Sequence, residues 1–185
     1  MKTSMFEIFR AVCGAVLLCA ALGLPPATSA RTLDEIMPPT LPTPMCDAVN
    51  VPAGNKLVRR MYAKGVQIYK WNGASWTFVA PAADLYADPG FHGKIGTHYG
   101  GPTWESNSGG KVIGSVVARC APDPTSIAWL RLKAISTSGP GVFRKITFIQ
   151  RVNTSGGLAP VTPGTAIDEV VEVPYTTEYY FYQAE

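Results

Sequence analysis

Residues 96–104 read Gly-Thr-His-Tyr-Gly-Gly-Pro-Thr-Trp, and no other stretch of the chain combines residue types with as much chemical potential. Glycines and a proline define the backbone around His98, one of only 2 histidines in the sequence. An imidazole can carry a proton near neutral pH or bind a metal, and Tyr99 and Trp104 add aromatic faces beside it. The segment therefore predicts a site, without indicating what that site does.

His98 has two interpretations. In the first it is a proton carrier or metal ligand; in the second its ring bonds a backbone carbonyl and holds its own loop. A metal centre needs three or four ligands, and the sequence contains no H-x-x-x-H, no C-x-x-C and no acidic calcium loop. We predict no cofactor and no classical zinc site; a copper or mixed-carboxylate site stays open, with His98 as the only candidate ligand.

Glu105 and a later polar segment supply the other candidate groups. An apolar pocket beside Trp104 would raise the pKa of the Glu105 carboxyl and suit it to act as an acid. The cation of Arg151 is able to pair with an acidic ligand or with Glu105. The alternative is surface charge, and a strand end whose polar groups bond the local backbone. The candidate binding residues are His98, Tyr99, Trp104, Glu105, Gln150, Arg151 and Asn153.

Aromatic side chains are a second indication of binding. The tryptophans and residues 175–182 present flat faces of the kind that sugar sites use, although aromatic residues in strands usually pack in a core or across strands. Tyr69 and Trp71 share one face of a predicted strand, and Val66 and Ile68 share the other. Unless the sheet is buried on both sides, one of these two faces is exposed to solvent. Catalytic signatures are missing, since the sequence has neither G-x-S-x-G nor G-x-G-x-x-G.

Alternating apolar and polar residues predict strands from Lys56 onward. Residues 66–71 and 75–79 flank Asn72-Gly73, and this pattern predicts a hairpin with a type I′ turn, whose central residues need positive φ. Residues 80–88 fit either a short strand or one helical turn. Further strands are expected within residues 111–118, 128–134, 142–152 and 172–182.

Turn signals between these runs set the fold class. No helical periodicity longer than two turns follows residue 30. The pattern predicts an all-β fold, an antiparallel β-sandwich or small barrel of about seven or eight strands, with an extended proline-rich N-terminal arm.

The N-terminal residues predict export. Lys2 and Arg10 accompany an apolar run at residues 11–22 that is too short to span a bilayer, and small residues ending at Ala30 suit cleavage there. We expect a signal peptide at residues 1–30, a proline-rich arm at 31–52 and a single β domain at 53–185. The mature protein would then be secreted or periplasmic, with no transmembrane segment.

Cysteine content predicts a disulfide, and the net charge excludes some classes of binding partner. Cys46 and Cys120 remain after the predicted cleavage and would form one disulfide in an oxidising compartment; the alternative is two free thiols, because sequence does not show how close their Cα atoms lie. The net charge is only +3, and no basic run extends beyond Arg59-Arg60. Nucleic acid and anionic membranes are therefore not expected as partners, and the oligomeric state is left open.

The order of several short segments resembles a known family. Residues 65–69, 80–85, 96–98, 101–104, 149–154, 156–160 and 174–176 are similar to pieces of domain of unknown function 3455 (DUF3455), a family of exported proteins of bacteria and fungi. The resemblance covers residues 51–182. It implies export, and it carries no established activity.

One departure from the family bears on the fold. Relatives often have a cysteine at the position of Trp71 and another near Thr165. If relatives join these positions, the resemblance implies that the end of the first hairpin strand lies near residues 162–165. Both cysteines are missing here, so a family disulfide does not transfer, and Cys46 and Cys120 offer a different one.

Three functions follow, in this order. The first is an exported module that binds a small molecule or a carbohydrate such as envelope polysaccharide. The second is a hydrolase-type enzyme with a site around His98, Glu105 and Arg151. The third is a metal-binding exported protein that uses His98. Convergence of His98, Trp104, Glu105, Gln150 and Arg151 on one pocket would favour a ligand or active site.

Overall fold

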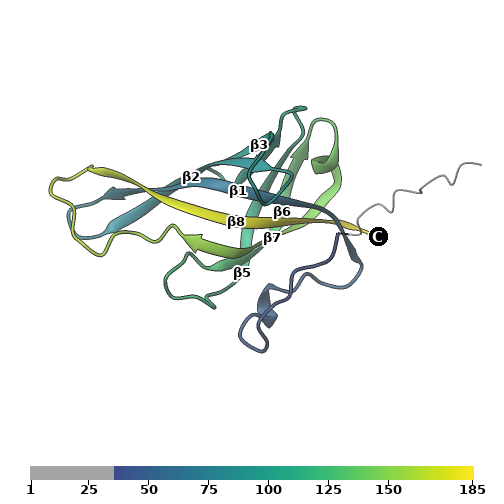
Figure 1. The fold of residues 1–185 in the computed structure, drawn as a ribbon, viewed down its shortest axis with the longest axis horizontal. Coiled ribbons are helices and arrows are strands. Elements are labelled where there is room, and N and C mark those ends of the chain that lie inside the picture. Colours follow the sequence, from purple (N-terminus) through teal and green to yellow (C-terminus); the bar gives the residue numbers. More distant parts are fainter. Residues whose placement is uncertain (1–35) are drawn as a thin grey trace, which may run out of the picture. The chain divides into compact units, whose positions relative to one another are not determined.

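The computed structural model describes residues 36–185, which form one antiparallel sheet closed into a barrel. Each strand pairs with the next, and the last pairs with the first (Figure 1). The all-β prediction is confirmed. The elements in order are η1 (Asp47–Val49), β1 (Asn55–Trp71), β2 (Trp76–Tyr86), β3 (Lys94–Tyr99), β4 (Thr103–Ser106), β5 (Lys111–Cys120), β6 (Trp129–Ser138), η2 (Val142–Lys145), β7 (Ile146–Gly156) and β8 (Val170–Ala184).

The predicted signal peptide and its cleavage site lie outside the described residues, as does the start of the predicted arm. Within residues 36–185, no helix is long and apolar enough to cross a membrane.

The first hairpin forms as predicted, but its turn is longer. Trp71 pairs with Trp76, so residues 72–75 make the loop. The Asn72 Oδ1 atom accepts the backbone N–H groups of Ala74 and Ser75 at 2.9 and 2.8 Å, and within the loop only Gly73 takes a positive φ, of 94°. The expected type I′ turn is therefore wrong, because the Asn72 side chain organises a wider loop.

The structure decides one open alternative, at residues 80–86, and corrects one predicted strand boundary, at residues 142–145. Residues 80–86 continue β2 as a strand rather than a helical turn. Residues 142–145, expected as the start of a strand, form the 3-10 helix η2. The preceding Gly141 has a φ of 83°, and η2 directs the fully buried Phe143 against Phe181, with ring centroids 4.9 Å apart.

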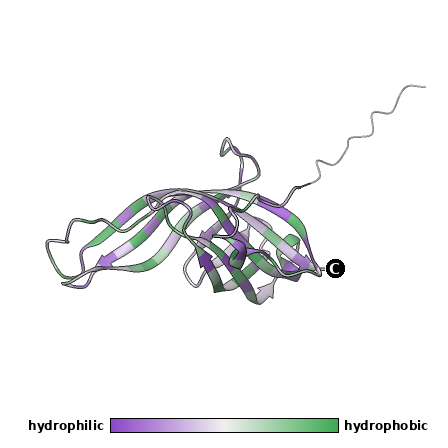
Figure 2. Cartoon of the chain, turned by 90° about the horizontal axis from the view of Figure 1, so that it is seen from below, coloured by the Kyte–Doolittle hydropathy of each residue, from purple (hydrophilic) through white to green (hydrophobic). Residues whose placement is uncertain are grey.

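Hydrophilic and hydrophobic residues follow one another in short bands along the strands (Figure 2). A period of two is expected of strands. Along β1, the buried row includes Met61, Ala63, Gln67 and Tyr69. The main core cluster combines residues from every strand: Met61, Ala63, Ala83, Leu85, Trp104, Val112, Ile127, Leu132, Phe143, Ile146, Ile149, Tyr175, Tyr179 and Phe181, with partly buried Ile95 of β3 packed against it.

The N-terminal arm packs against the outer face of the barrel. Cys46 and Cys120 form a disulfide with a Cα–Cα distance of 5.3 Å, so the expected bond is present. A second apolar cluster surrounds it and includes Val49 of η1 and Trp129 of β6. The arm thus covers a surface that would otherwise be exposed and apolar.

β1, β2 and β8 run beyond the other strands at one end of the barrel (Figure 1). β2 pairs with β3 only over residues 83–86, whereas β1 pairs with β8 as far as Lys70 and Val170. The loop before β8 folds onto this extension, since Trp76 Nε1 donates to Thr162 O at 2.9 Å and Gly164 lies against Trp71. The implied proximity of Trp71 to residues 162–165 is confirmed.

Candidate functional site

Residues 96–104 form the β3–β4 hairpin. His98 pairs with Trp104 and Tyr99 with Thr103, and Gly101 has a positive φ of 85° in the turn between the strands. At Gly96 a Cβ atom would lie 2.4 Å from Glu105 O, so only glycine permits this strand approach. The unusual composition thus fixes a tight hairpin that places His98 and Trp104 opposite each other.

His98 points into the barrel and is 3% exposed. Its ring stacks on Trp104 with centroids 4.4 Å apart and meets Tyr179 edge-on at 5.1 Å. Nδ1 lies 2.8 Å from Thr103 O, and because a carbonyl can only accept, Nδ1 carries the hydrogen. Burial lowers the His98 pKa to about 3. The imidazole is therefore neutral at physiological pH, with Nε2 unprotonated.

A pocket of about 310 Å³ occupies the end of the barrel from which β1, β2 and β8 extend. His98 lines it, so this residue both holds its own hairpin and faces the cavity. Most of the wall is apolar, and its apolar members are Phe78, Val79, Pro81, Pro102, Val116, Ile127, Ala128, Leu130, Leu132 and Leu158. The polar side chains that line it are Gln67, Tyr69, His98, Trp104, Arg119, Arg151 and Tyr179.

Arg151 supplies the partly buried positive charge of the pocket. Its Nε and Nη2 atoms donate to Ala128 O at 3.1 and 2.7 Å. Among the described residues that line the pocket there is no carboxylate. Burial raises the pKa of Tyr69 and of Tyr179, and the cation of Arg151 opposes both rises. The charge of Arg151 therefore acts on both of these tyrosine hydroxyls.

Three pocket side chains form what we call the donor cluster: Gln67, Trp104 and Tyr179. Within residues 36–185, Gln67 Nε2, Trp104 Nε1 and the Tyr179 hydroxyl make no hydrogen bond of good geometry, although the three residues are only 2%, 1% and 0% exposed. The buried Tyr175 hydroxyl also makes no hydrogen bond of good geometry. Gln67 and Tyr179 lie close enough to the Tyr175 hydroxyl, and Arg151 close enough to the Tyr179 hydroxyl, to shift the pKa of these tyrosines. Unpartnered buried donors are uncommon because each costs roughly 1–3 kcal/mol.

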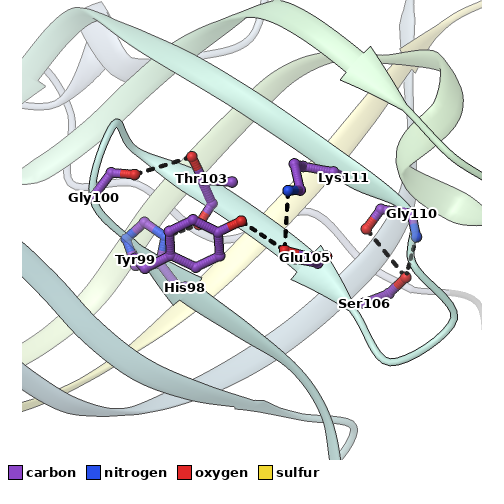
Figure 3. Close-up of polar contacts among 8 residues, drawn as sticks. All are labelled: His98, Tyr99, Gly100, Thr103, Glu105, Ser106, Gly110 and Lys111. Atoms are coloured by element: carbon purple, nitrogen blue, oxygen red, sulfur yellow. Dashed lines mark hydrogen bonds and ion pairs between the residues drawn. The ribbon is translucent and has the colours of Figure 1, made fainter.

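The structure places Tyr99 and Glu105 on the outer face of the same hairpin. The Tyr99 hydroxyl donates to Glu105 Oε2 at 2.6 Å, and Lys111 Nζ lies 3.2 Å from the same oxygen (Figure 3). The hydrogen bond from Tyr99, and then that from Lys111, lower the Glu105 pKa. This is opposite to the expectation of a raised pKa in an apolar pocket, because Glu105 points away from that pocket.

The expected catalytic group of His98, Glu105 and Arg151 is therefore not assembled. Strand alternation explains this, since Glu105 follows the inward-facing Trp104 by one residue. A metal site around His98 also lacks ligands: within residues 36–185, no group of three or more His, Cys, Asp or Glu side chains converges.

Gln150 and Asn153 also lie away from the pocket. Gln150 Nε2 donates 2.7 Å to Val49 O beneath the N-terminal arm, and its Oε1 accepts from Tyr182. Asn153 has a φ of 52° at an irregularity of β7 and donates to Glu178 at 3.1 Å. Of the sequence-predicted residues, the structure brings together His98, Trp104 and Arg151.

Gln67, Tyr69 and Tyr179 were not among the candidate site residues expected from the sequence, although Tyr69 and residues 175–182 were noted there as aromatic faces. A signal for Gln67 was available: it stands two residues from Tyr69, on the same face of a strand as Met61 and Ala63. A polar residue in an apolar, inward-facing row indicates either a buried hydrogen bond or a site.

Comparison with known proteins places the chain in a family. Residues 52–183 match the family described as Protein of unknown function (DUF3455). The chain belongs to the DUF3455 family. No curated protein and no solved structure matches it. The DUF3455 match spans β1 to β7 and nearly all of β8, so the pocket lies wholly within the family region.

Proposed function

We propose that this DUF3455 protein is an exported module that binds a small, mainly apolar molecule inside its barrel. The observation that carries the proposal is the pocket of about 310 Å³, with apolar walls and the buried donor cluster among its lining residues. Small-molecule sites commonly combine roughly 300–1,000 Å³ of apolar cavity with a few convergent polar groups. Closed barrels of eight strands are of a size to hold one small ligand.

An interior ligand fits better than a polysaccharide on the surface. A sugar-binding face needs exposed aromatic rings, but Trp71, Trp104 and Trp129 are all buried. Trp76 packs against Trp71 with centroids 5.4 Å apart. The aromatic residues that first suggested carbohydrate binding mainly serve packing.

Export is part of the proposal. The Cys46–Cys120 disulfide supports an oxidising compartment. The N-terminal sequence, with basic residues, an apolar run and small residues ending at Ala30, supports the same destination.

Blocking the mouth of the pocket tests the proposal. Val116 lines the pocket and is 36% exposed, so Val116→Trp should fill the cavity without disturbing the core. We expect roughly tenfold or greater loss of affinity for N-phenyl-1-naphthylamine, a neutral apolar probe whose fluorescence rises in a dry site. The matched control is Val117→Trp on the adjacent residue, which is 48% exposed and does not line the pocket. Equal binding by both variants, or no binding by the unmodified protein, would overturn the proposed function.

A further inference from the structure

The balance of hydrogen-bonding groups in the pocket identifies the chemistry of its ligand. The donor cluster places the buried N–H and O–H groups of Gln67, Trp104 and Tyr179 in residues that line the pocket. Trp104 can only donate, because an indole nitrogen has no acceptor capacity. Against these stands the Nε2 atom of His98, an acceptor by virtue of the Nδ1 hydrogen bond to Thr103. A ligand must therefore supply mainly acceptors.

The charge balance points the same way. Arg151 uses Nε and Nη2 on Ala128 O, and its guanidinium also lies close enough to the Tyr179 hydroxyl to lower the pKa of that group. Arg119 is the other charged residue of the lining, and it is exposed. The nearby carboxylates face outward and are already engaged: Asp84 with Lys94 at 2.6 Å, and Glu105 with Lys111 at 3.2 Å. Within the described lining, the positive charge of Arg151 has no anionic partner.

We propose that the ligand is a small organic acid, an apolar body carrying one acidic oxygen group that binds Arg151 and the donor cluster. This inference rests on the proposed function and adds the class of ligand to it. The apolar body would lie among Phe78, Leu130 and Leu132 on the wall, while the acidic oxygens accept from Trp104, Tyr179 and Arg151. Burial raises the pKa of Tyr179, so its hydroxyl stays protonated and remains a donor at neutral pH.

A pair of probes equal in shape and different in charge tests the class of ligand. We would compare 2-naphthoate with 2-naphthamide as competitors that displace N-phenyl-1-naphthylamine from the protein without its predicted signal peptide. We expect the carboxylate to compete at concentrations at least about tenfold lower, because hydrogen bonds to a charged group in a dry site are the stronger ones. In Arg151→Gln this preference should fall to within about threefold, with affinity for the neutral amide retained.

A matched variant separates the two arginines of the lining. Arg119→Gln removes the same charge from an exposed position, where water screens it, so the preference for the carboxylate should change by less than about threefold. Loss of the preference in Arg119→Gln but not in Arg151→Gln would overturn the assignment of Arg151.

Arg151 also supports the loop at Ala128, so Arg151→Gln could unfold the protein. Tyr179→Phe keeps the test decisive, because it removes a hydroxyl that makes no hydrogen bond of good geometry within residues 36–185. We expect it to weaken 2-naphthoate roughly fivefold, with 2-naphthamide unaffected and Tm equal to or above that of the unmodified protein.

The outcomes distinguish the two proposals. If the neutral probe binds but carboxylate and amide compete equally, the organic-acid inference fails and the proposed function stands. If the carboxylate preference survives in both Arg151→Gln and Tyr179→Phe, the inference fails as well. If the neutral probe does not bind the unmodified protein, both fail.

Discussion

Replacing both cysteines, Cys46→Ser with Cys120→Ser, should lower the free energy of unfolding by about 4 kcal/mol, because the bond closes a long loop in the unfolded chain. The two residues are separated by 74 positions, and the bond also anchors the arm that carries Val49 onto the outer face of the barrel. Urea denaturation followed by circular dichroism measures the loss.

The affinity of the double variant for the fluorescent probe serves as the control. The arm lies on the outer face, whereas the pocket opens at an end of the barrel, so folded Cys46→Ser/Cys120→Ser should bind N-phenyl-1-naphthylamine with nearly unchanged affinity. Unmodified protein reduced with a thiol should lose the same stability as the double variant. A loss below about 1 kcal/mol would contradict the account of the arm as a stabilising element.

Trp104→Ala should cost about 3–5 kcal/mol of unfolding free energy, the range for removing a large buried aromatic side chain. Trp104 is 1% exposed and packs against His98, Tyr179 and Phe181, with centroid distances of 4.4, 5.2 and 6.1 Å. Its ring also fills the space above Gly114. Chemical denaturation measures the cost.

His98 provides an independent readout of the same variant. Burial holds the His98 pKa at about 3, and removing the stacked indole admits water, so the pKa should rise toward the ordinary value of 6.5. Titration of the imidazole by NMR would detect this. The matched control is Trp76→Ala, where a partly buried tryptophan at the end of the extension is removed, with an expected cost of roughly 1–2 kcal/mol. Equal costs for both variants, or an unmoved His98 pKa, would contradict the packing described for Trp104.

The fold class could be predicted from sequence because it depends on local patterns. Alternation in residues 66–71 and the Asn72-Gly73 pair indicated a hairpin, and turn signals indicated many short strands. Closure could not be predicted in the same way. It depends on pairing of β1 with β8, two strands from opposite ends of the domain, and no local pattern specifies such a long-range contact.

The candidate site could be predicted in part, and the errors have one cause. Neighbouring strand residues face opposite sides of a sheet, so Tyr99 beside His98, Glu105 beside Trp104 and Gln150 beside Arg151 all point outward. Polar and aromatic residues that are adjacent in the sequence of a strand therefore lie on opposite faces of the sheet. Gln67 and Tyr179 were not predicted because only barrel closure brings their strands together beside the β3–β4 hairpin.

The indole N–H signals test the central claim most directly. The chain has 4 tryptophans, and of these only Trp104 lines the barrel pocket. In a proton–nitrogen correlation spectrum, titration with 2-naphthoate should move the Trp104 indole signal strongly and leave those of Trp71, Trp76 and Trp129 nearly in place. If the Trp104 indole signal does not move, whether or not those of the other tryptophans do, the result would contradict a ligand site inside the barrel.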